Sequence, residues 1–356
     1  MDKIAKLPMQ ERQELIIATA SKMKISEAIV EKDFWVCFCL DYLFHECKWK
    51  EAFAFKGGTS LSKAYGLIER FSEDIDLILD WRVIGYKKDE PWEERSNTKQ
   101  LKFLEDSRIR LFDFLRNDFL PIFKADMKKK LGMSVDAFIT EEDAGTVHWR
   151  YPNAFYDNAI LNEIRLEIGA MAAWTPTQLV DISSYMAEKY PNVFEKKDTR
   201  ILTTTAERTF WEKATILHQE AYRPKNSKIP DRYSRHYYDL YCMAETEVLD
   251  KALAQADLLE QVAKFKRKFY PRNWAKYELA RMDSIKLMPA EHSIERLETD
   301  YGVMRTMIYG KYPKFNDVLK RLQELEETIH LRGVFPDMRY LEPESECISR
   351  RSGVPL

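Results

Sequence analysis

The chain has 356 residues, of which 45% are hydrophobic and 32% charged, a composition typical of an ordered globular protein and not of a disordered one. Its 56 basic and 58 acidic residues leave a formal net charge of -2, so any surface for nucleic acid has to be a local feature. The length allows a sizeable core and two domains.

Cysteine usage and the lack of long apolar runs predict a cytoplasmic protein. The five cysteines are odd in number and no pair has the Cys-x-x-Cys spacing, which argues against a zinc site and a disulfide framework. Free thiols fit a reducing cytosol. The first residues are charged and contain no apolar signal core, and no apolar run is long enough to span a bilayer. We therefore expect no membrane partner.

The first part of the chain is predicted to mix helices and strands. Apolar residues recur with helical spacing in two segments, and the second of these is apolar enough to be buried. A third helix is expected to begin at Ser60, a residue type that is favoured near helix N-termini. Two other segments are strands, and the second strand alternates acidic and aliphatic residues with period two. The elements expected up to residue 80 are helices over 11–24, 26–46 and 60–69, and strands over 53–55 and 74–80.

The rest of the chain is predicted to become helical near residue 205. A polar loop is expected over 81–98, and a helix interrupted near Pro121 follows it. The later expected elements are helices over 99–131, 206–221, 235–245, 247–268 and 315–330, and strands over 163–169 and 201–205. We therefore divide the chain into a core with N-terminal helices (1–205), a helical domain that completes the site (206–341) and a loose tail (342–356).

The most informative stretch joins the first predicted strand to the second. Two glycines directly after a strand, Gly57 and Gly58, let the backbone turn sharply and approach a ligand closely. The hydroxyls of Thr59 and Ser60, together with the free N–H groups at the next helix start, suit phosphate oxygens. The sequence therefore predicts a phosphate-binding turn at this point.

Asp74 and Asp76 lie in the second predicted strand, on one face and about 7 Å apart at their Cα atoms. Carboxylate oxygens are ligands that Mg²⁺ (or Mn²⁺) prefers, and two such cations stabilise the attacking and leaving oxygens of a phosphoryl displacement. An isolated Asp-x-Asp is more often solvated, but the order strand, Gly-Gly-Thr-Ser, helix, Asp-x-Asp strand favours a nucleotide site. No P-loop or Gly-x-Gly-x-x-Gly pattern is present.

These motifs resemble those of the AbiEii/AbiGii-type nucleotidyltransferase toxins, the toxin half of bacterial toxin–antitoxin pairs. The resemblance spans roughly residues 30–245, and the first motif is the most specific. His236 departs from the family, which usually has Asp after the arginine of the last motif. The similar segments are Glu31-Lys32-Asp33, Lys56-Gly57-Gly58-Thr59-Ser60-Leu61, Arg70-Phe71-Ser72-Glu73-Asp74-Ile75-Asp76-Leu77, Glu212-Lys213 and Arg235-His236-Tyr237-Tyr238-Asp239-Leu240.

The resemblance implies an α+β fold with a DNA polymerase β-like nucleotidyltransferase core and a helical C-terminal domain. It implies a nucleoside triphosphate as substrate, RNA (notably tRNA) or a protein as acceptor, and a cognate antitoxin protein. Asp74 and Asp76 would bind metal, Lys213 would neutralise phosphate charge, and Asp239 would be a further essential acid. The expected nucleotide-binding residues are Lys56, Gly57, Gly58, Thr59, Ser60, Lys63, Arg70 and Lys213.

Glu167 is the candidate for a third carboxylate, as base or ligand, because it lies opposite an apolar strand face. The alternative is that it pairs with Arg165 or faces solvent. Arg235 and Asp239 are four residues apart, so a simple helical ion pair is also possible.

Basic residues outside these motifs offer further surfaces for an acceptor. A run over residues 264–272 either binds an RNA backbone or, as is more common, forms a solvated helix face. The segment over residues 222–235 contains five basic residues and is a candidate for contacting substrate phosphates.

Three hypotheses remain open from the sequence. An active nucleotidyltransferase toxin explains all the motifs. A non-catalytic nucleotide- or RNA-binding module would keep the cavity without forming a product. A metal-dependent nuclease would use the same clustered carboxylates for hydrolysis.

Overall fold

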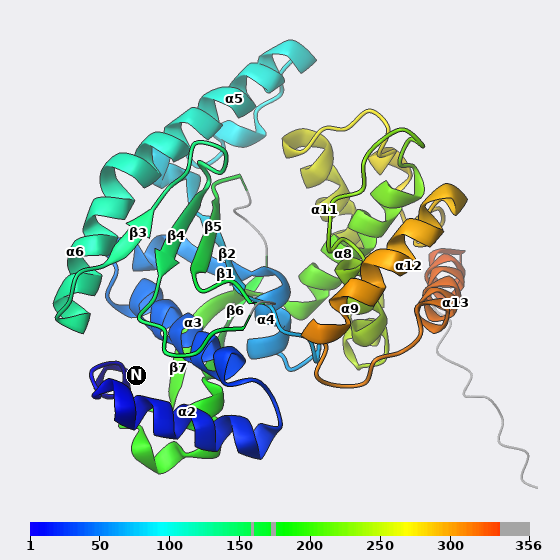
Figure 1. Cartoon of the computed structure of the whole chain (residues 1–356). Helices are drawn as coiled ribbons and strands as arrows, with labels where there is room; N and C mark the ends of the chain where they lie inside the picture. The colour runs from blue at the N-terminus through cyan, green and yellow to red at the C-terminus, as the bar shows by residue number, and fades with distance from the viewer. Residues whose placement is uncertain (158–159, 172–175, 335–356) are drawn as a thin grey trace, which may run out of the picture.

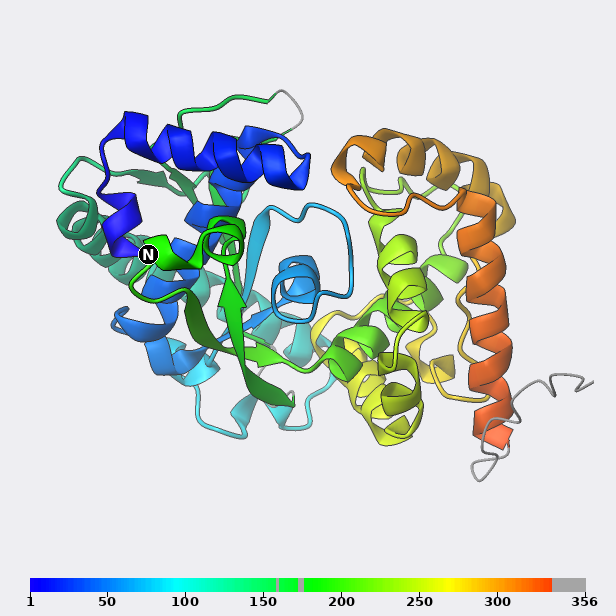
Figure 2. The same ribbon diagram turned by 90° about the horizontal axis from the view of Figure 1, so that it is seen from below.

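A computed structural model describes residues 1–157, 160–171 and 176–334. Figure 1 shows a part that contains a β-sheet beside a part made of helices, with helix α4 between them. Figure 2 shows the same two parts from below, with α13 at the outer edge of the helical part. This arrangement confirms the predicted α+β class.

A seven-stranded mixed sheet forms the centre of the first part, in the order β3-β4-β5-β2-β1-β7-β6. The central strand β2 pairs antiparallel with β1 and parallel with β5. The strands are β1 (Phe53–Lys56), β2 (Asp74–Leu79), β3 (Asp136–Phe138), β4 (Thr146–Arg150), β5 (Ile164–Gly169), β6 (Thr177–Ser183) and β7 (Asp198–Thr204).

The aliphatic face of the central strands is covered by helices. Trp149 of β4 packs edge-on against Trp35 of α3 and Phe123 of α6, with ring centroids 5.8 Å apart in both pairs. Phe53 of β1 contacts Phe119, which belongs to a single π-helical turn (Leu115–Phe119) joining α5 to α6. Because side chains alternate along a strand, the polar face of β2 and β5 points away from these helices.

Helix α3 is buried although it carries three consecutive charged residues, each of which bonds to a different segment. Glu31 accepts hydrogen bonds from the backbone N–H groups of residues 154 and 155. The Lys32 ammonium lies 2.7 Å from Glu73, the residue before Asp74. Asp33 accepts a backbone hydrogen bond from residue 185 and pairs with a lysine of α4. The pairing compensates for burying these charges.

The helical part has its own core, to which Leu61 and Ile68 from the sheet-containing part also contribute. In the other direction, Phe265 and Phe269 of α11 belong to the core of the sheet-containing part. The division at residue 205 therefore stays a proposal, although the chain does change there from β7 to α8. The predicted loose tail over 342–356 lies outside the described residues.

The helices are α1 (Asp2–Ala5), α2 (Met9–Met23), α3 (Glu27–His45), α4 (Gly57–Lys63), α5 (Asn97–Phe114), α6 (Leu120–Leu131), α7 (Tyr185–Lys189), α8 (Ala206–Ala221), α9 (Arg235–Ala244), α10 (Val248–Leu253), α11 (Ala256–Phe269), α12 (Ile294–Val303) and α13 (Phe315–Val334). Short 3-10 turns cover Lys50–Ala52, Trp81–Ile84, Glu90–Trp92, Pro191–Val193, Tyr277–Leu279, Glu291–Ser293 and Met304–Met307. Within the described part of the chain, no helix is both long and apolar enough to cross a membrane.

Candidate active site

The polar face of the sheet brings the predicted acids together. In the parallel pairing of β2 with β5, Asp76 lies directly opposite Glu167, and Asp74 lies opposite Arg165. In the antiparallel pairing of β2 with β1, Lys56 lies opposite Asp76. Since paired residues project to the same face, the three carboxylates and two cations share one surface.

The two glycines after β1 are required by close contacts with this surface. Gly57 has a φ of +82°, and a Cβ atom there would lie 1.9 Å from Oδ2 of Asp76. A Cβ atom on Gly58 would lie 2.6 Å from the Arg70 guanidinium and 2.8 Å from the Ser72 hydroxyl. The turn can therefore lie directly against the acids only because both positions are glycine and have no Cβ atom.

A cavity of 140 Å³ opens over the acids, and both parts of the molecule line it. Helices α8 and α9 supply the wall that faces the sheet. The lining residues are Lys56, Gly57, Gly58, Arg70, Ser72, Asp74, Asp76, Glu167, Thr209, Glu212, Lys213, Ile216, Arg235 and His236. Ser72 and Glu212 were not singled out from the sequence, although both stand inside the quoted motifs.

Asp239 lies behind this wall, fully buried, and joins the two parts of the molecule. It accepts two hydrogen bonds from Arg70, at 2.6 and 2.8 Å, and its Oδ2 lies 2.7 Å from the Lys213 ammonium. Burial opposes ionisation, but the two cations outweigh it and hold the pKa of Asp239 well below its usual value. The alternative ion pair with Arg235 is therefore wrong, because other cations occupy the carboxylate.

Lys213 is held in one position by two partners. Its ammonium also donates to Nδ1 of His236 at 3.1 Å. Burial and neighbouring cations, Lys213 first among them, lower the pKa of His236 far below its usual value, so the ring is neutral and can accept this bond. Burial lowers the pKa of Lys213 despite the attraction of Asp239.

The acids on the sheet carry negative charge that the protein compensates only in part. Asp74 Oδ1 is buried and has no hydrogen-bond partner. Burial and repulsion by Asp76 and Asp74 raise the pKa of Glu167 to about 7. Arg165 contacts two of these acids, with guanidinium nitrogens 3.3 Å from Glu167 and 3.9 Å from Asp74. The predicted alternative of a Glu167–Arg165 pair is thus present together with the carboxylate cluster.

Two cations of the cavity wall keep their charge available for a ligand. Among the described residues, neither the Lys56 ammonium nor the Arg235 guanidinium has a carboxylate within 4.0 Å. Burial acts against the charge of Lys56, but Glu212 and Asp76 outweigh it and raise the pKa of Lys56. Lys56 therefore stays protonated at neutral pH while it lies beside the cavity.

Three predicted nucleotide-binding side chains do not reach the cavity. The Thr59 hydroxyl donates to the backbone carbonyl of Asp74 at 2.6 Å, and the Ser60 hydroxyl donates to that of Gly57 at 2.8 Å. Lys63 pairs with buried Asp33 at 2.7 Å. These groups fix the shape of the Gly-Gly turn, and any phosphate contact by them stays a prediction.

Arg70 does line the cavity, but Asp239 occupies its Nε and Nη2 donors and the Phe71 carbonyl its Nη1. The basic run of α11 is also engaged: Lys268 donates to the Glu93 carbonyl and Lys266 to that of Glu212. The α11 run therefore helps to join the two parts of the molecule.

Asp80, which follows the last residue of β2, pairs with Arg82 outside the site.

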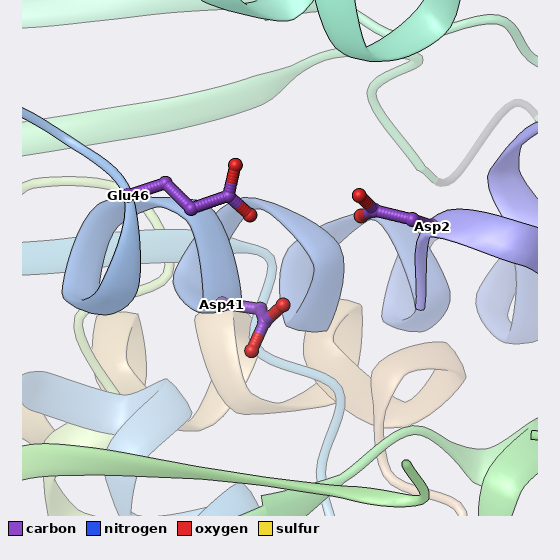
Figure 3. Close-up of side chains that lie close together, drawn as sticks. All are labelled: Asp2, Asp41 and Glu46. Carbon is purple, nitrogen blue, oxygen red and sulfur yellow. The ribbon is translucent and has the colours of Figure 1, made fainter. Parts of the chain in front are cut away.

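A separate carboxylate group, Asp2, Asp41 and Glu46, comes within 4.8 Å among the described residues (Figure 3). Asp74, Asp76 and Glu167 do not approach one another so closely. The negative charge of this group is already partly neutralised, because the Lys130 ammonium forms ion pairs with both Asp2 and Glu46. Asp41, the third member, accepts a hydrogen bond from the Thr199 hydroxyl at 2.5 Å.

A family model described as nucleotidyl transferase AbiEii toxin, type IV TA system, matches residues 41–321. The chain belongs to this family. AbiEii-family membership makes the protein a nucleotidyltransferase of the toxin–antitoxin type. The match includes Asp74, Asp76, Lys213 and Asp239, and begins after the charged triplet of α3.

Solved structures similar to this AbiEii-family chain include two bacterial proteins. The nucleotidyltransferase toxin MenT4 from Mycobacterium tuberculosis H37Rv aligns with a TM-score of 0.41 at 14% identity, over 90% of this chain and 98% of its own. JHP933 from Helicobacter pylori aligns with a TM-score of 0.41 at 14% identity, over 86% of this chain and 94% of its own. No curated protein matches the sequence.

Proposed function

We propose that the protein transfers a nucleotidyl group from a nucleoside triphosphate to an acceptor, and that the cavity over Asp74 and Asp76 is its active site. The observation that carries the proposal is the convergence of three carboxylates and two unpaired cations on one cavity. A triphosphate is the ligand whose negative charge matches Lys56 and Arg235, while the carboxylates match the divalent cations that accompany it.

Asp74, Asp76 and Glu167 fit a site for Mg²⁺ or Mn²⁺. The unpartnered Oδ1 of Asp74 and the raised pKa of Glu167 both indicate charge that a cation would compensate. Bound divalent cations would neutralise the phosphate oxygens and polarise the phosphorus towards attack. Glu167 is the proposed third carboxylate, as a ligand or as the base for the acceptor hydroxyl.

Lys56 and Arg235 are proposed to bind and orient the triphosphate from opposite sides of the cavity. Lys213 is proposed to stabilise the negative charge of the phosphates, with Asp239 and His236 holding its ammonium in a fixed position at the cavity wall. The Gly-Gly turn lets the backbone approach the ligand, because no side chain separates it from Asp76.

The acceptor is proposed to be RNA, with tRNA as the first candidate, or a protein hydroxyl. Modification of such an acceptor in the cytoplasm would inhibit growth, in keeping with the toxin family, and a cognate antitoxin would relieve the inhibition. Family membership supports the toxin–antitoxin setting. The nucleotide and the acceptor are what the following experiment identifies.

The test is incubation of the protein with each α-labelled nucleoside triphosphate, Mg²⁺ or Mn²⁺, and total bacterial RNA. Asp76→Asn removes a carboxylate of the site, and Asp80→Asn is the matched control, since Asp80 pairs with Arg82 outside the cavity. We expect label in RNA or protein with wild type and Asp80→Asn but not with Asp76→Asn. RNA shortened without added triphosphate would instead identify a nuclease. Bound triphosphate without any product would identify a binding module.

A further inference from the structure

The turn before α9 has a strained backbone. Arg232 has a φ of +58°, a left-handed conformation that costs a residue with a side chain free energy and persists only where neighbouring groups enforce it. The turn leads directly into α9, which begins at Arg235 and carries His236 and Asp239. The groups that hold this turn therefore influence where three site residues lie.

One carboxylate outside the cavity over the acids holds the turn. Asp300 of α12 accepts a hydrogen bond from the backbone N–H of Arg232 at 2.6 Å. Its other oxygen accepts from the backbone N–H of Ser234 at 2.8 Å and from the Ser234 hydroxyl at 2.5 Å. Buried Leu297 and Tyr301 fix α12 in the core of the helical part, so Asp300 has a rigid support.

The turn is also tied across to the sheet. The Arg232 guanidinium lies 2.9 Å from Oε1 of Glu73, whose other carboxylate oxygen accepts from Lys32 at 2.7 Å. Glu73 directly precedes Asp74. Arg232 and Arg235 also share a small cavity of 20 Å³ with Glu73 and Asp74. The chain of contacts thus runs from α12 through the turn to the start of β2.

We infer that Asp300 is a positioning residue, which acts through Arg232 to set the distance between the first turn of α9 and the acids of β2. This inference rests on the proposed function for its catalytic consequence, because Arg235 is the residue proposed to bind the triphosphate. Its geometric part stands independently: removing the carboxylate must release the strained turn. Arg232→Gly separates the contribution of the backbone turn from that of the Arg232 guanidinium. Glycine adopts a positive φ without strain but has no guanidinium to pair with Glu73.

The experiment compares Asp300→Asn with Arg296→Gln in the full chain. Asparagine has the same shape but a single acceptor oxygen, so it cannot serve both Arg232 and Ser234. Arg296 is the matched control, because it lies one turn earlier on α12 and pairs with Asp231 of the same turn, with both side chains more than half exposed. Three quantities are measured: hydrogen–deuterium exchange of residues 233–238, steady-state kinetics and the Tm of thermal unfolding.

We expect faster amide exchange over residues 233–238 in Asp300→Asn and unchanged exchange in Arg296→Gln. The KM for the triphosphate should rise about tenfold with a smaller change in kcat, because Arg235 is no longer held in position to bind the phosphates. Arg232→Gly should keep slow exchange yet raise KM. Unchanged exchange in Asp300→Asn would overturn the inference, as would a lower Tm with unchanged KM. If the wild-type protein transfers no nucleotide, the proposed function fails while the exchange measurement still decides the positioning role.

Discussion

Replacing Asp239 by asparagine tests the buried network that joins the two parts of the molecule. The carboxylate is fully buried and serves Arg70 at 2.6 and 2.8 Å and Lys213 at 2.7 Å. Asparagine keeps the shape but removes the charge and directs an amide donor at a cation. Removing one partner of a buried ion pair costs roughly 3–5 kcal/mol, which corresponds to a fall in Tm on the order of 5–10 °C. Thermal unfolding followed by circular dichroism measures it, and transfer activity should be lost.

The control is Asp231→Asn, whose partner Arg296 and own side chain are both exposed. Exposed pairs are worth about 0–1 kcal/mol, so its Tm should hardly change. The pKa of Asp239 is lowered on folding, so its contribution is present above the ordinary value of 3.8 and is lost as pH falls towards the folded pKa. The difference in unfolding free energy between wild type and Asp239→Asn should therefore stay constant from neutral pH down to 3.8, and should narrow only below pH 3.8. An Asp239→Asn variant as stable as the control would refute the reasoning.

Two further substitutions test the acid cluster. Gly57→Ala should lower stability by roughly 1–3 kcal/mol through its positive φ and should abolish transfer, because its Cβ displaces the Asp76 carboxylate. Gly66→Ala shares the positive φ of +62° with no atom within 4 Å, so it should lose stability but keep transfer. Because folding raises the pKa of Glu167 to about 7, chelator-treated wild type should lose stability as pH rises from about 5 to 8. Glu167→Gln should flatten that decline and added Mn²⁺ should reverse it in wild type; a decline identical in both proteins would contradict the assignment.

Strongly periodic elements were predictable from the sequence, whereas strands without such a pattern were not. The helix predicted over 206–221 agrees with α8, and the acidic strand predicted over 74–80 agrees with β2 to within one residue. Strands β3, β4 and β6 were missed, because their pairing partners and not their own pattern define them. The predicted helix over 60–69 ends already at Lys63, and the single helix over 247–268 is two helices separated at residues 254–255.

The site was predictable where the backbone alone decides it and not where distant segments do. Period-two alternation placed Asp74, Asp76 and Glu167 on strand faces that the structure aligns in register. The partners of Lys63 and Asp239 come from segments far away in the chain. Sequence spacing therefore offered only Arg235 as a partner for Asp239 and gave no sign that Lys63 pairs with Asp33. Local patterns therefore located the acids, while tertiary contacts determined which cations are free to meet a ligand.

The charged triplet of α3 has a consequence for how this protein can be shortened. Successive residues of an α-helix point in directions about 100° apart, so Glu31, Lys32 and Asp33 reach three separate segments at once. The family match begins only at residue 41, downstream of all three. A fragment trimmed to that match would leave the Glu73 carboxylate with Arg232 but without Lys32, and would leave the α4 lysine without Asp33. The boundaries of the recognisable family segment are therefore not the boundaries of the folding unit, and expression designs need the N-terminal helices.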